Sequence, residues 1–132
     1  MHRNTSDPSG PTVLIVDDYE LTLKLLTDIL QYQGYTVFTT RLGKTAFELA
    51  RQHRPDLILM EIKLPDISGT EVARRLKENE LTRPIPIIAV TAFAMSGDEE
   101  KIRASGCDAY ISKPFRLVEL LNLVERWTPT RT

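Results

Sequence analysis

From Thr12 onwards the sequence alternates between short runs of β-branched and aliphatic residues and longer stretches in which apolar residues recur at helical spacing. This alternation is typical of βα units, which build a parallel sheet covered by helices. The runs predict five strands, at residues 12–16, 36–39, 57–60, 87–90 and 109–111. The first, third and fourth runs are nearly all apolar, as strands buried on both faces must be. The sequence therefore predicts an α/β fold.

Two of the predicted helices carry an apolar stripe that we expect to face the sheet. The stripe of the first helix consists of Leu21, Leu25, Leu26, Ile29 and Leu30. The stripe of the last helix consists of Leu117, Leu120, Leu121 and Val124. Gly34 and Gly106 are expected to end the first and the fourth helix, because glycine readily adopts the left-handed conformation that follows a helix.

Other local signals mark where helices begin and end. Pro55 must end the second helix, and we expect it to hold Arg54 in an extended conformation. Two helix starts match the capping box, in which a serine and a glutamate three residues later satisfy free backbone donors. The two pairs are Ser68 with Glu71 and Ser96 with Glu99.

Length and charge narrow the class of protein. The chain has 132 residues, 42% of them hydrophobic, which is enough for one core. Seventeen Lys and Arg against eighteen Asp and Glu give a net charge of -1, so we expect no direct binding to nucleic acid or to a membrane. We expect flexible tails at residues 1–11 and 128–132 around one domain at 12–127. The polar start and the lack of a long apolar run favour a cytoplasmic protein. The single cysteine, Cys107, is expected in the core.

Functional side chains follow every predicted strand except the second. Asp17 and Asp18 follow the first strand, Glu61 the third, Thr91 the fourth and Lys113 the fifth. In an open parallel sheet, functional groups gather at the carboxyl ends of the strands. If the first and third strands are neighbours, three carboxylates meet and repel one another unless a cation joins them. Oxygen ligands without a nearby Cys or His favour magnesium over zinc, and Lys113 would offset part of the remaining charge.

Each of these residues also has a simpler interpretation. Asp17 and Asp18 are suitable caps for the first helix, Thr91 is a suitable strand end, and Lys113 alone is a typical solvated lysine. Their equivalent places on separate strands favour a shared site, because capping does not require that coincidence. A cation and a hydroxyl beside an acidic nest suit the binding of a phosphoryl group.

Four stretches together resemble the receiver domains of two-component response regulators. They are VLIVDD at 13–18, PDLILMEIKLPDISG at 55–69, VTAFAM at 90–95 and YISKPF at 110–115. The resemblance extends from about residue 12 to residue 127 and is greatest to single-domain, DivK-like regulators. It implies a doubly wound, flavodoxin-like parallel sheet of five strands in the order 2-1-3-4-5, flanked by five helices.

The resemblance also implies roles for individual residues. Asp17 and Asp18 align with the acidic pair that holds magnesium, together with position 61 and the backbone carbonyl of Lys63. Thr91 and Lys113 align with the pair that contacts the phosphoryl group. Thr91 and Tyr110 align with the switch residues, and the bond between Lys113 and Pro114 aligns with a cis peptide.

One position departs from the family pattern. Glu61 stands where the family carries the aspartate that receives the phosphoryl group. The extra methylene moves the carboxylate by on the order of 1.5 Å, and misplacement by about 1 Å costs on the order of a hundredfold in rate. We therefore expect little or no stable phosphorylation of Glu61. Its single negative charge permits a partial imitation of the activated state or a locked inactive state, and either a natural or an introduced glutamate fits the otherwise intact site.

The leading hypothesis is a signalling module and not an enzyme. By resemblance, the partners are a sensor histidine kinase or a histidine phosphotransfer protein and a downstream protein, and the chain is a monomer or weak homodimer. Candidate kinase contacts are Tyr19, Leu23 and Phe93. The candidate output face, formed by the fourth helix, fifth strand and fifth helix, includes Lys101, Arg103, Tyr110, Phe115 and Val118. The alternative is a magnesium-dependent phosphatase on a similar sheet, although the chain has no insertion to form a cap over a substrate.

Overall fold

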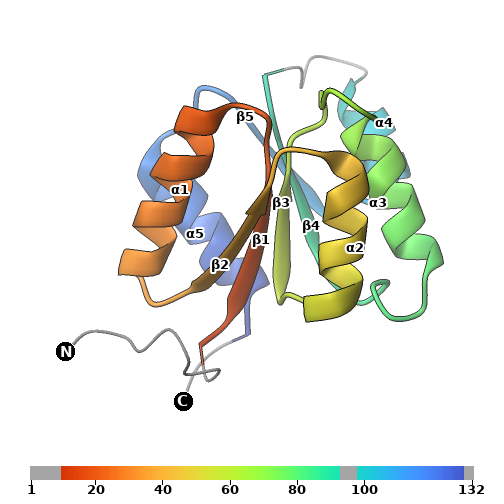
Figure 1. Ribbon diagram of the computed structural model, residues 1–132. Coiled ribbons are helices and arrows are strands. Elements are labelled where there is room, and N and C mark those ends of the chain that lie inside the picture. Colours follow the sequence, from red (N-terminus) through yellow and green to blue (C-terminus); the bar gives the residue numbers. More distant parts are fainter. Residues whose placement is uncertain (1–9, 93–97, 130–132) are drawn as a thin grey trace.

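The computed structural model describes residues 10–92 and 98–129, and within them five parallel strands are flanked by five helices (Figure 1). The strands are β1 (Thr12–Val16), β2 (Thr36–Thr40), β3 (Leu57–Met60), β4 (Ile87–Thr91) and β5 (Ala109–Ser112). The helices are α1 (Glu20–Tyr32), α2 (Gly43–His53), α3 (Gly69–Glu78), α4 (Asp98–Ala104) and α5 (Leu117–Trp127). The strand order is β2-β1-β3-β4-β5, as predicted. All five predicted strands are present, three of them one residue longer than expected.

Helices cover both faces of the sheet. α1 and α5 lie on one face, and α2, α3 and α4 lie on the other (Figure 1). Alternate residues of one strand serve the two cores: Leu14 and Val16 pack toward α2 and α3, while Val13 and Ile15 pack toward α1 and α5. Burial of each such side chain contributes roughly 1.5–3 kcal/mol. The continuous apolar runs in the sequence are therefore the result of burial on both faces.

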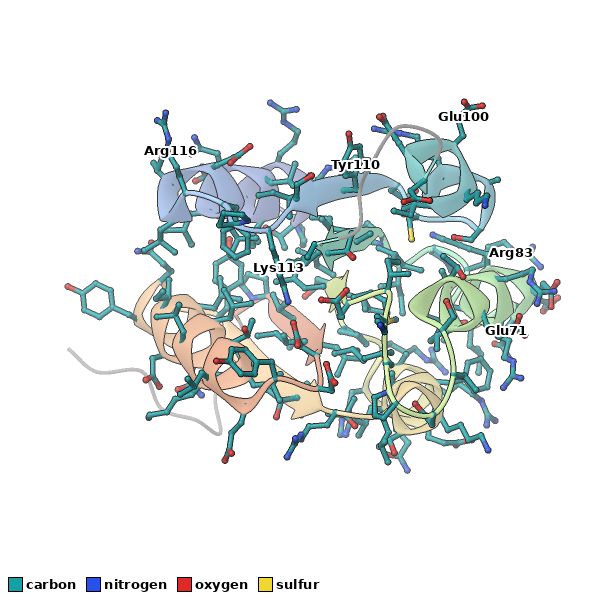
Figure 2. All side chains as sticks on the ribbon, turned by 90° about the horizontal axis from the view of Figure 1, so that it is seen from above. Glu71, Arg83, Glu100, Tyr110, Lys113 and Arg116 are labelled. Atoms are coloured by element: carbon teal, nitrogen blue, oxygen red, sulfur yellow. The ribbon has the colours of Figure 1, made fainter. Side chains whose placement is uncertain are left out.

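The register brings the carboxyl ends of the strands to one edge. Val16, the last residue of β1, lies beside Thr40 of β2 and Met60 of β3. Thr91, the last residue of β4, lies beside Ser112 of β5. The residues that follow these ends therefore meet in one region, which Figure 2 shows from above.

The predicted apolar stripe of α1 is partly wrong. Leu26 and Leu30 are buried, but Leu21 is 64% and Leu25 is 56% exposed. Leu23, which we expected to be an exposed contact for a kinase, is instead buried against the sheet. The cause is that α1 has apolar residues on two opposite faces, and helical spacing alone does not tell which face packs on the sheet.

The stripe of α5 needs a smaller correction. Leu120 and Val124 are buried and Leu121 packs against the same core, as predicted. Leu117, the first residue of the helix, is 42% exposed. Cys107 is buried, as expected for a small core residue.

The backbone at helix ends confirms two predictions and overturns one. Gly34 and Gly106 have φ values of 99° and 112°, in the left-handed region. Arg54 has a φ of 45° and is not extended as we expected. Its N–H donates to the carbonyl of Ala50 at 2.9 Å, so this residue ends α2 in a left-handed cap.

The capping box predicted at α3 forms only in part. Ser68 is the N-cap, and its hydroxyl accepts a hydrogen bond from the N–H of Thr70 at 3.1 Å. The carboxylate of Glu71 does not complete the box, because it pairs with Arg74 and Arg75 on the exposed side of the helix. Ser96, the cap predicted for the next helix, lies outside the described residues.

Both ends of the described chain are in contact with the domain. Pro11 is buried, and its carbonyl accepts from the N–H of Thr36 at 3.0 Å. The hydroxyl of Thr128 donates to the carbonyl of Val124 at 2.9 Å. Among the helices of residues 10–92 and 98–129, none has the length and apolar character needed to cross a membrane.

Candidate functional site

The loop after β1 carries an almost fully buried carboxylate. Asp17 is 2% exposed. One of its oxygens, Oδ1, accepts from the N–H of Tyr19 at 2.9 Å, and Oδ2 accepts from Nζ of Lys113 at 2.9 Å. The N-cap of α1 is Tyr19 and no side chain caps it, so the interpretation of Asp17 and Asp18 as simple helix caps does not describe this loop.

Arg41 fixes the neighbouring backbone. Its Nε and Nη2 donate to the carbonyl oxygen of Asp18 at 3.2 and 2.9 Å. The N–H of Asp17 also donates to the carbonyl of Thr40 at 3.1 Å. The acidic loop is therefore anchored to the end of β2, the one strand that no predicted site residue follows. No local signal in the sequence indicates this role for Arg41.

Glu61 also lies in a buried position, with 6% of its surface exposed. Its Oε1 accepts from Nζ of Lys113 at 2.8 Å. Its Oε2 accepts from the N–H groups of Ile62 and Lys63 at 2.7 and 3.3 Å, and its own N–H donates to the carbonyl of Val16 at 2.9 Å. The carboxylate thus turns back onto its own loop while it remains paired with the lysine.

Lys113 joins the two buried carboxylates. It follows β5, and its side chain points toward the ends of β1 and β3 (Figure 2). Its N–H donates to the carbonyl of Thr91 at 2.9 Å, and its peptide bond to Pro114 is cis. Burial lowers the pKa of Lys113, but the hydrogen bonds that its ammonium group donates to Glu61 and Asp17 outweigh that effect and hold the pKa above its usual value.

The loop between Glu61 and α3 is held in place by close contacts. The N–H of Gly69 donates to the carbonyl of Ile62 at 2.7 Å. A Cβ at Gly69 would lie 2.2 Å from the carbonyl oxygen of Glu61 and 2.9 Å from Cα of Ile62. Both contacts are with backbone, which has little freedom to move aside, so only glycine fits here.

Asp66 ties the same loop to α2. Its Oδ1 and Oδ2 accept from the N–H groups of Gly43 and Lys44, at 2.8 and 2.9 Å, at the start of that helix. Desolvation raises the pKa of Asp66, but the backbone hydrogen bonds led by Lys44 and Gly43 lower it to about 2. No local signal in the sequence indicates this role for Asp66, because the helix start that it caps lies more than 20 residues away.

The structure brings most of the predicted site residues around one pocket of about 350 Å³. Its lining consists of Asp17, Asp18, Tyr19, Glu61, Lys63, Leu64, Pro65 and Lys113. Thr91, at the end of β4, is fully buried. Tyr110 is half-buried on β5, and its hydroxyl donates to Oε1 of Glu99 at 2.9 Å. The hydrogen bond to this carboxylate is the largest cause that raises the pKa of Tyr110, and burial adds to it.

The side chains around the pocket offer the oxygen ligands that magnesium prefers. Asp17, Asp18 and Glu61 supply carboxylate oxygens, and Lys63 also lines the pocket. Within the described residues, no three Asp, Glu, His or Cys side chains form a metal-ligating group. Lys113 holds one oxygen each of Asp17 and Glu61. A metal ion here would share these two carboxylates with the ammonium group.

Comparison with known proteins assigns the family. Residues 13–125 match the family model of the response regulator receiver domain. The chain belongs to this family. Two relatives of this receiver domain, the polar-differentiation response regulators DivK of Brucella anthropi and Brucella ovis, are each 52% identical to it over 116 residues. The match covers 88% of this chain and 94% of each relative. The receiver domain is thus DivK-like and belongs to two-component signalling.

Solved structures share the fold. The receiver domain of the sensor histidine kinase PA1611 from Pseudomonas aeruginosa, with a magnesium ion coordinated in its active site cleft, is 35% identical with a TM-score of 0.83, over 89% of this chain and 97% of that one. The chemotaxis protein CheY4 of Vibrio cholerae is 26% identical with a TM-score of 0.84, over 89% of this chain and 98% of that one.

Proposed function

We propose that this receiver domain binds Mg²⁺ and passes a conformational state to a protein partner, and that Glu61 impairs its stable phosphorylation. The observation that carries the proposal is the placement of Glu61. It stands at the end of the central strand β3, buried beside the acidic loop and paired with Lys113. This is the position at which the phosphoryl group is attached in the family, and Lys113 joins it to the buried carboxylate of Asp17.

Two features of Glu61 argue against efficient phosphoryl transfer. Its longer side chain displaces the nucleophilic oxygen by on the order of 1.5 Å relative to aspartate. Both of its carboxylate oxygens are also engaged, Oε1 by Lys113 and Oε2 by the N–H groups of Ile62 and Lys63. In-line attack depends on positioning, so both features reduce the rate. The resident carboxylate supplies one negative charge where a phosphoryl group would supply nearly two, so it imitates the activated state only in part.

In this proposal Asp17, Asp18, Glu61 and the backbone carbonyl of Lys63 hold the metal ion. Bound Mg²⁺ supplies positive charge against the transferring phosphoryl oxygens and offsets the repulsion among the carboxylates. Lys113 orients Glu61 and keeps a second positive charge at the rim of the pocket. Thr91 and Lys113 are the proposed phosphoryl contacts, with the N–H of Lys113 bonded to the carbonyl of Thr91.

We place the contact with a histidine kinase or phosphotransfer protein beside the pocket, at the start of α1. Tyr19 lines the pocket and is 57% exposed. Leu21 and Leu25 extend this exposed apolar surface along the helix. Leu23, which we expected to contribute to it, is buried. Phe93, the third residue expected here, lies outside the described residues. An exposed apolar stripe that continues from a polar pocket suits a protein contact.

We place the contact with a downstream protein on the face formed by α4, β5 and α5. Val118 is 60% exposed there, and Lys101 and Arg103 are also exposed. Phe115 contributes less to this surface, because it packs against the core beneath α1 and α5. The part of Tyr110 that reaches this face is its hydroxyl, which is bonded to α4.

The test is phosphorylation by acetyl phosphate in the presence of Mg²⁺, measured by intact-protein mass. We expect almost no phosphoryl adduct on the native chain and a stoichiometric, Mg²⁺-dependent adduct on Glu61→Asp. The matched control Glu61→Gln keeps the length of the side chain and removes its charge, and it should gain no adduct. A stoichiometric adduct on native Glu61 would overturn the geometric argument, and an inert Glu61→Asp variant would contradict a competent receiver site.

A further inference from the structure

The connection between β2 and α2 is short and firmly held where it leaves the sheet. It consists of Arg41 and Leu42 alone, and it lies at the same end of the sheet as the end of β1 (Figure 1). The carbonyl of Thr40, the last residue of β2, accepts from the N–H of Asp17 at 3.1 Å. The hydroxyl of Thr40 accepts from the N–H of Leu42 at 3.2 Å. The backbone of Arg41 is therefore fixed beside the acidic loop.

The other end of this connection is fixed by the start of α2. The N–H groups of Gly43 and Lys44 donate to the two carboxylate oxygens of Asp66, in the loop before α3, at 2.8 and 2.9 Å. A Cβ at Gly43 would lie 2.8 Å from Cγ1 of Ile67 and 2.8 Å from Cγ2 of Val72. The start of α2 thus lies in close contact with that loop and gives the connection a firm base.

The side chain of Arg41 holds the peptide unit between Asp18 and Tyr19. Its Nε and Nη2 donate to the carbonyl oxygen of that unit at 3.2 and 2.9 Å, and two donors of one planar group fix direction as well as distance. The N–H of the same unit donates to Oδ1 of Asp17 at 2.9 Å. Because a peptide unit is planar, one bonded unit positions both acidic residues, Asp17 through its carboxylate and Asp18 through its Cα.

The guanidinium group of Arg41 has two effects of opposite sign on a bound cation. Its positive charge near Asp18 repels a divalent ion, whereas its hydrogen bonds hold the loop in place before the ion arrives. Both Arg41 and Asp18 are exposed, so salt at about 0.15 M, with a Debye length of about 8 Å, screens the repulsion. Loss of a residue that positions a metal ligand typically costs roughly 10–100-fold in metal affinity. The positioning effect is therefore the larger one.

We propose that Arg41 is a positioning residue of the magnesium site, which holds the acidic loop in the arrangement that binds the metal ion. This role rests on the proposed function. Arg41→Ala should weaken the binding of Mg²⁺ by about tenfold, at the lower end of the range because the contact is exposed. Arg41→Lys keeps the charge but cannot present two donors from one plane, so its affinity should fall between those of Arg41→Ala and the native chain.

The test is a titration of the ¹⁵N-labelled full chain with Mg²⁺ at about 0.15 M salt, in which the amide signals of residues 17–19 give the dissociation constant. Arg51→Ala is the matched control. It removes the same charge from the exposed surface of α2, where Arg51 pairs with Glu48 at 3.4 Å, and it should bind Mg²⁺ as the native chain does. Urea unfolding of the same variants separates the two roles, because an arginine that only stabilises the fold would lower the unfolding midpoint and leave the dissociation constant unchanged.

A second readout needs no metal ion. The ¹³C signal of the Asp18 carbonyl reports the hydrogen bonds that its oxygen accepts. In the metal-free protein, this signal should move in both Arg41 variants and stay in place in Arg51→Ala.

Each possible result decides the inference. Affinity for Mg²⁺ that is unchanged in Arg41→Lys, or tighter in Arg41→Ala, would show that only the charge of Arg41 matters and would overturn the positioning role. An equal loss in Arg51→Ala, or an Asp18 carbonyl signal that stays in place in the Arg41 variants, would overturn it as well. If the native chain shows no saturable response to Mg²⁺, the proposed function fails and this role fails with it. A saturable response that is equal in the native chain and both Arg41 variants refutes the role of Arg41 alone.

Discussion

Replacing Lys113 with methionine removes the cation that two buried carboxylates share while keeping a side chain of similar length. In the native structure, Nζ lies 2.9 Å from Oδ2 of Asp17 and 2.8 Å from Oε1 of Glu61. The side chains of these two acids are only 3% and 7% exposed. Water therefore reaches them poorly, and the substitution leaves two neighbouring negative charges without the cation that joins them, held by backbone N–H groups.

The expected cost is about 3 kcal/mol in the free energy of unfolding. Removal of one partner from a buried ion pair costs roughly 3–5 kcal/mol. The Lys113 side chain is itself 22% exposed, and this partial hydration favours the lower end of that range. With a urea m-value of about 2 kcal/mol/M, the loss corresponds to a fall of about 1.5 M in the unfolding midpoint.

Urea unfolding at pH 7, followed by the fluorescence of the single tryptophan, Trp127, measures the effect. Lys24→Met is the control, because Lys24 also pairs with an acid, Asp28, but across 3.4 Å on an exposed helix surface. We expect the control to lose no more than about 0.5 kcal/mol. If Lys113→Met cost no more than Lys24→Met, the carboxylates would have to be well hydrated and our description of the pocket would be wrong.

Three further results are expected. Gly69→Ala should cost more than about 2 kcal/mol in urea unfolding, since the new Cβ meets backbone of Glu61 and the residue after it; full stability would refute the close contact. Asp66→Ala should lower stability at pH 7 by about 0.5–1 kcal/mol through loss of the α2 cap. The pKa of Asp66 is lowered to about 2, so its contribution is present above pH 3.8 and is lost as the pH falls toward 2; thermal unfolding of native and variant chains should converge over that range. The pKa of Lys113 is raised, so its contribution is present below about pH 10.4 and is lost at higher pH. In thermal unfolding above that pH, the native and Lys24→Met chains should both lose this contribution, whereas Lys113→Met should lack the dependence, so that the three chains converge in stability.

The sequence was sufficient to predict the strands and the edge at which the site lies. Runs such as the one before Asp17 are apolar throughout because both faces of the sheet are covered, and that pattern is local. The polar residues that come at the ends of these runs can be read from the same short stretches of sequence. In a parallel sheet with the observed order, Asp17, Glu61 and Lys113 then have to meet at one edge.

What the sequence did not predict depends on contacts between distant segments. Leu21 and Leu23 have the same chemistry, and only the packing of α1 on the sheet makes one exposed and the other buried. Arg41 and Asp66 act on backbone groups more than 20 residues away. Arg54 adopts a left-handed conformation because its N–H still bonds to the last turn of α2, which outweighs the local preference before proline.

The missing side chain at Gly69 has a consequence for how a signal can leave the pocket. The first residue of α3 rests directly on the carbonyl of Glu61, and Asp66 fastens the intervening loop to α2. These contacts tie position 61 to the first turns of α2 and α3, so we expect a change of charge at the pocket to displace these two helices little. α4, the third helix of this face, buries only Ile102 among its seven residues, so we expect a response on this face to involve α4 more than α2 or α3.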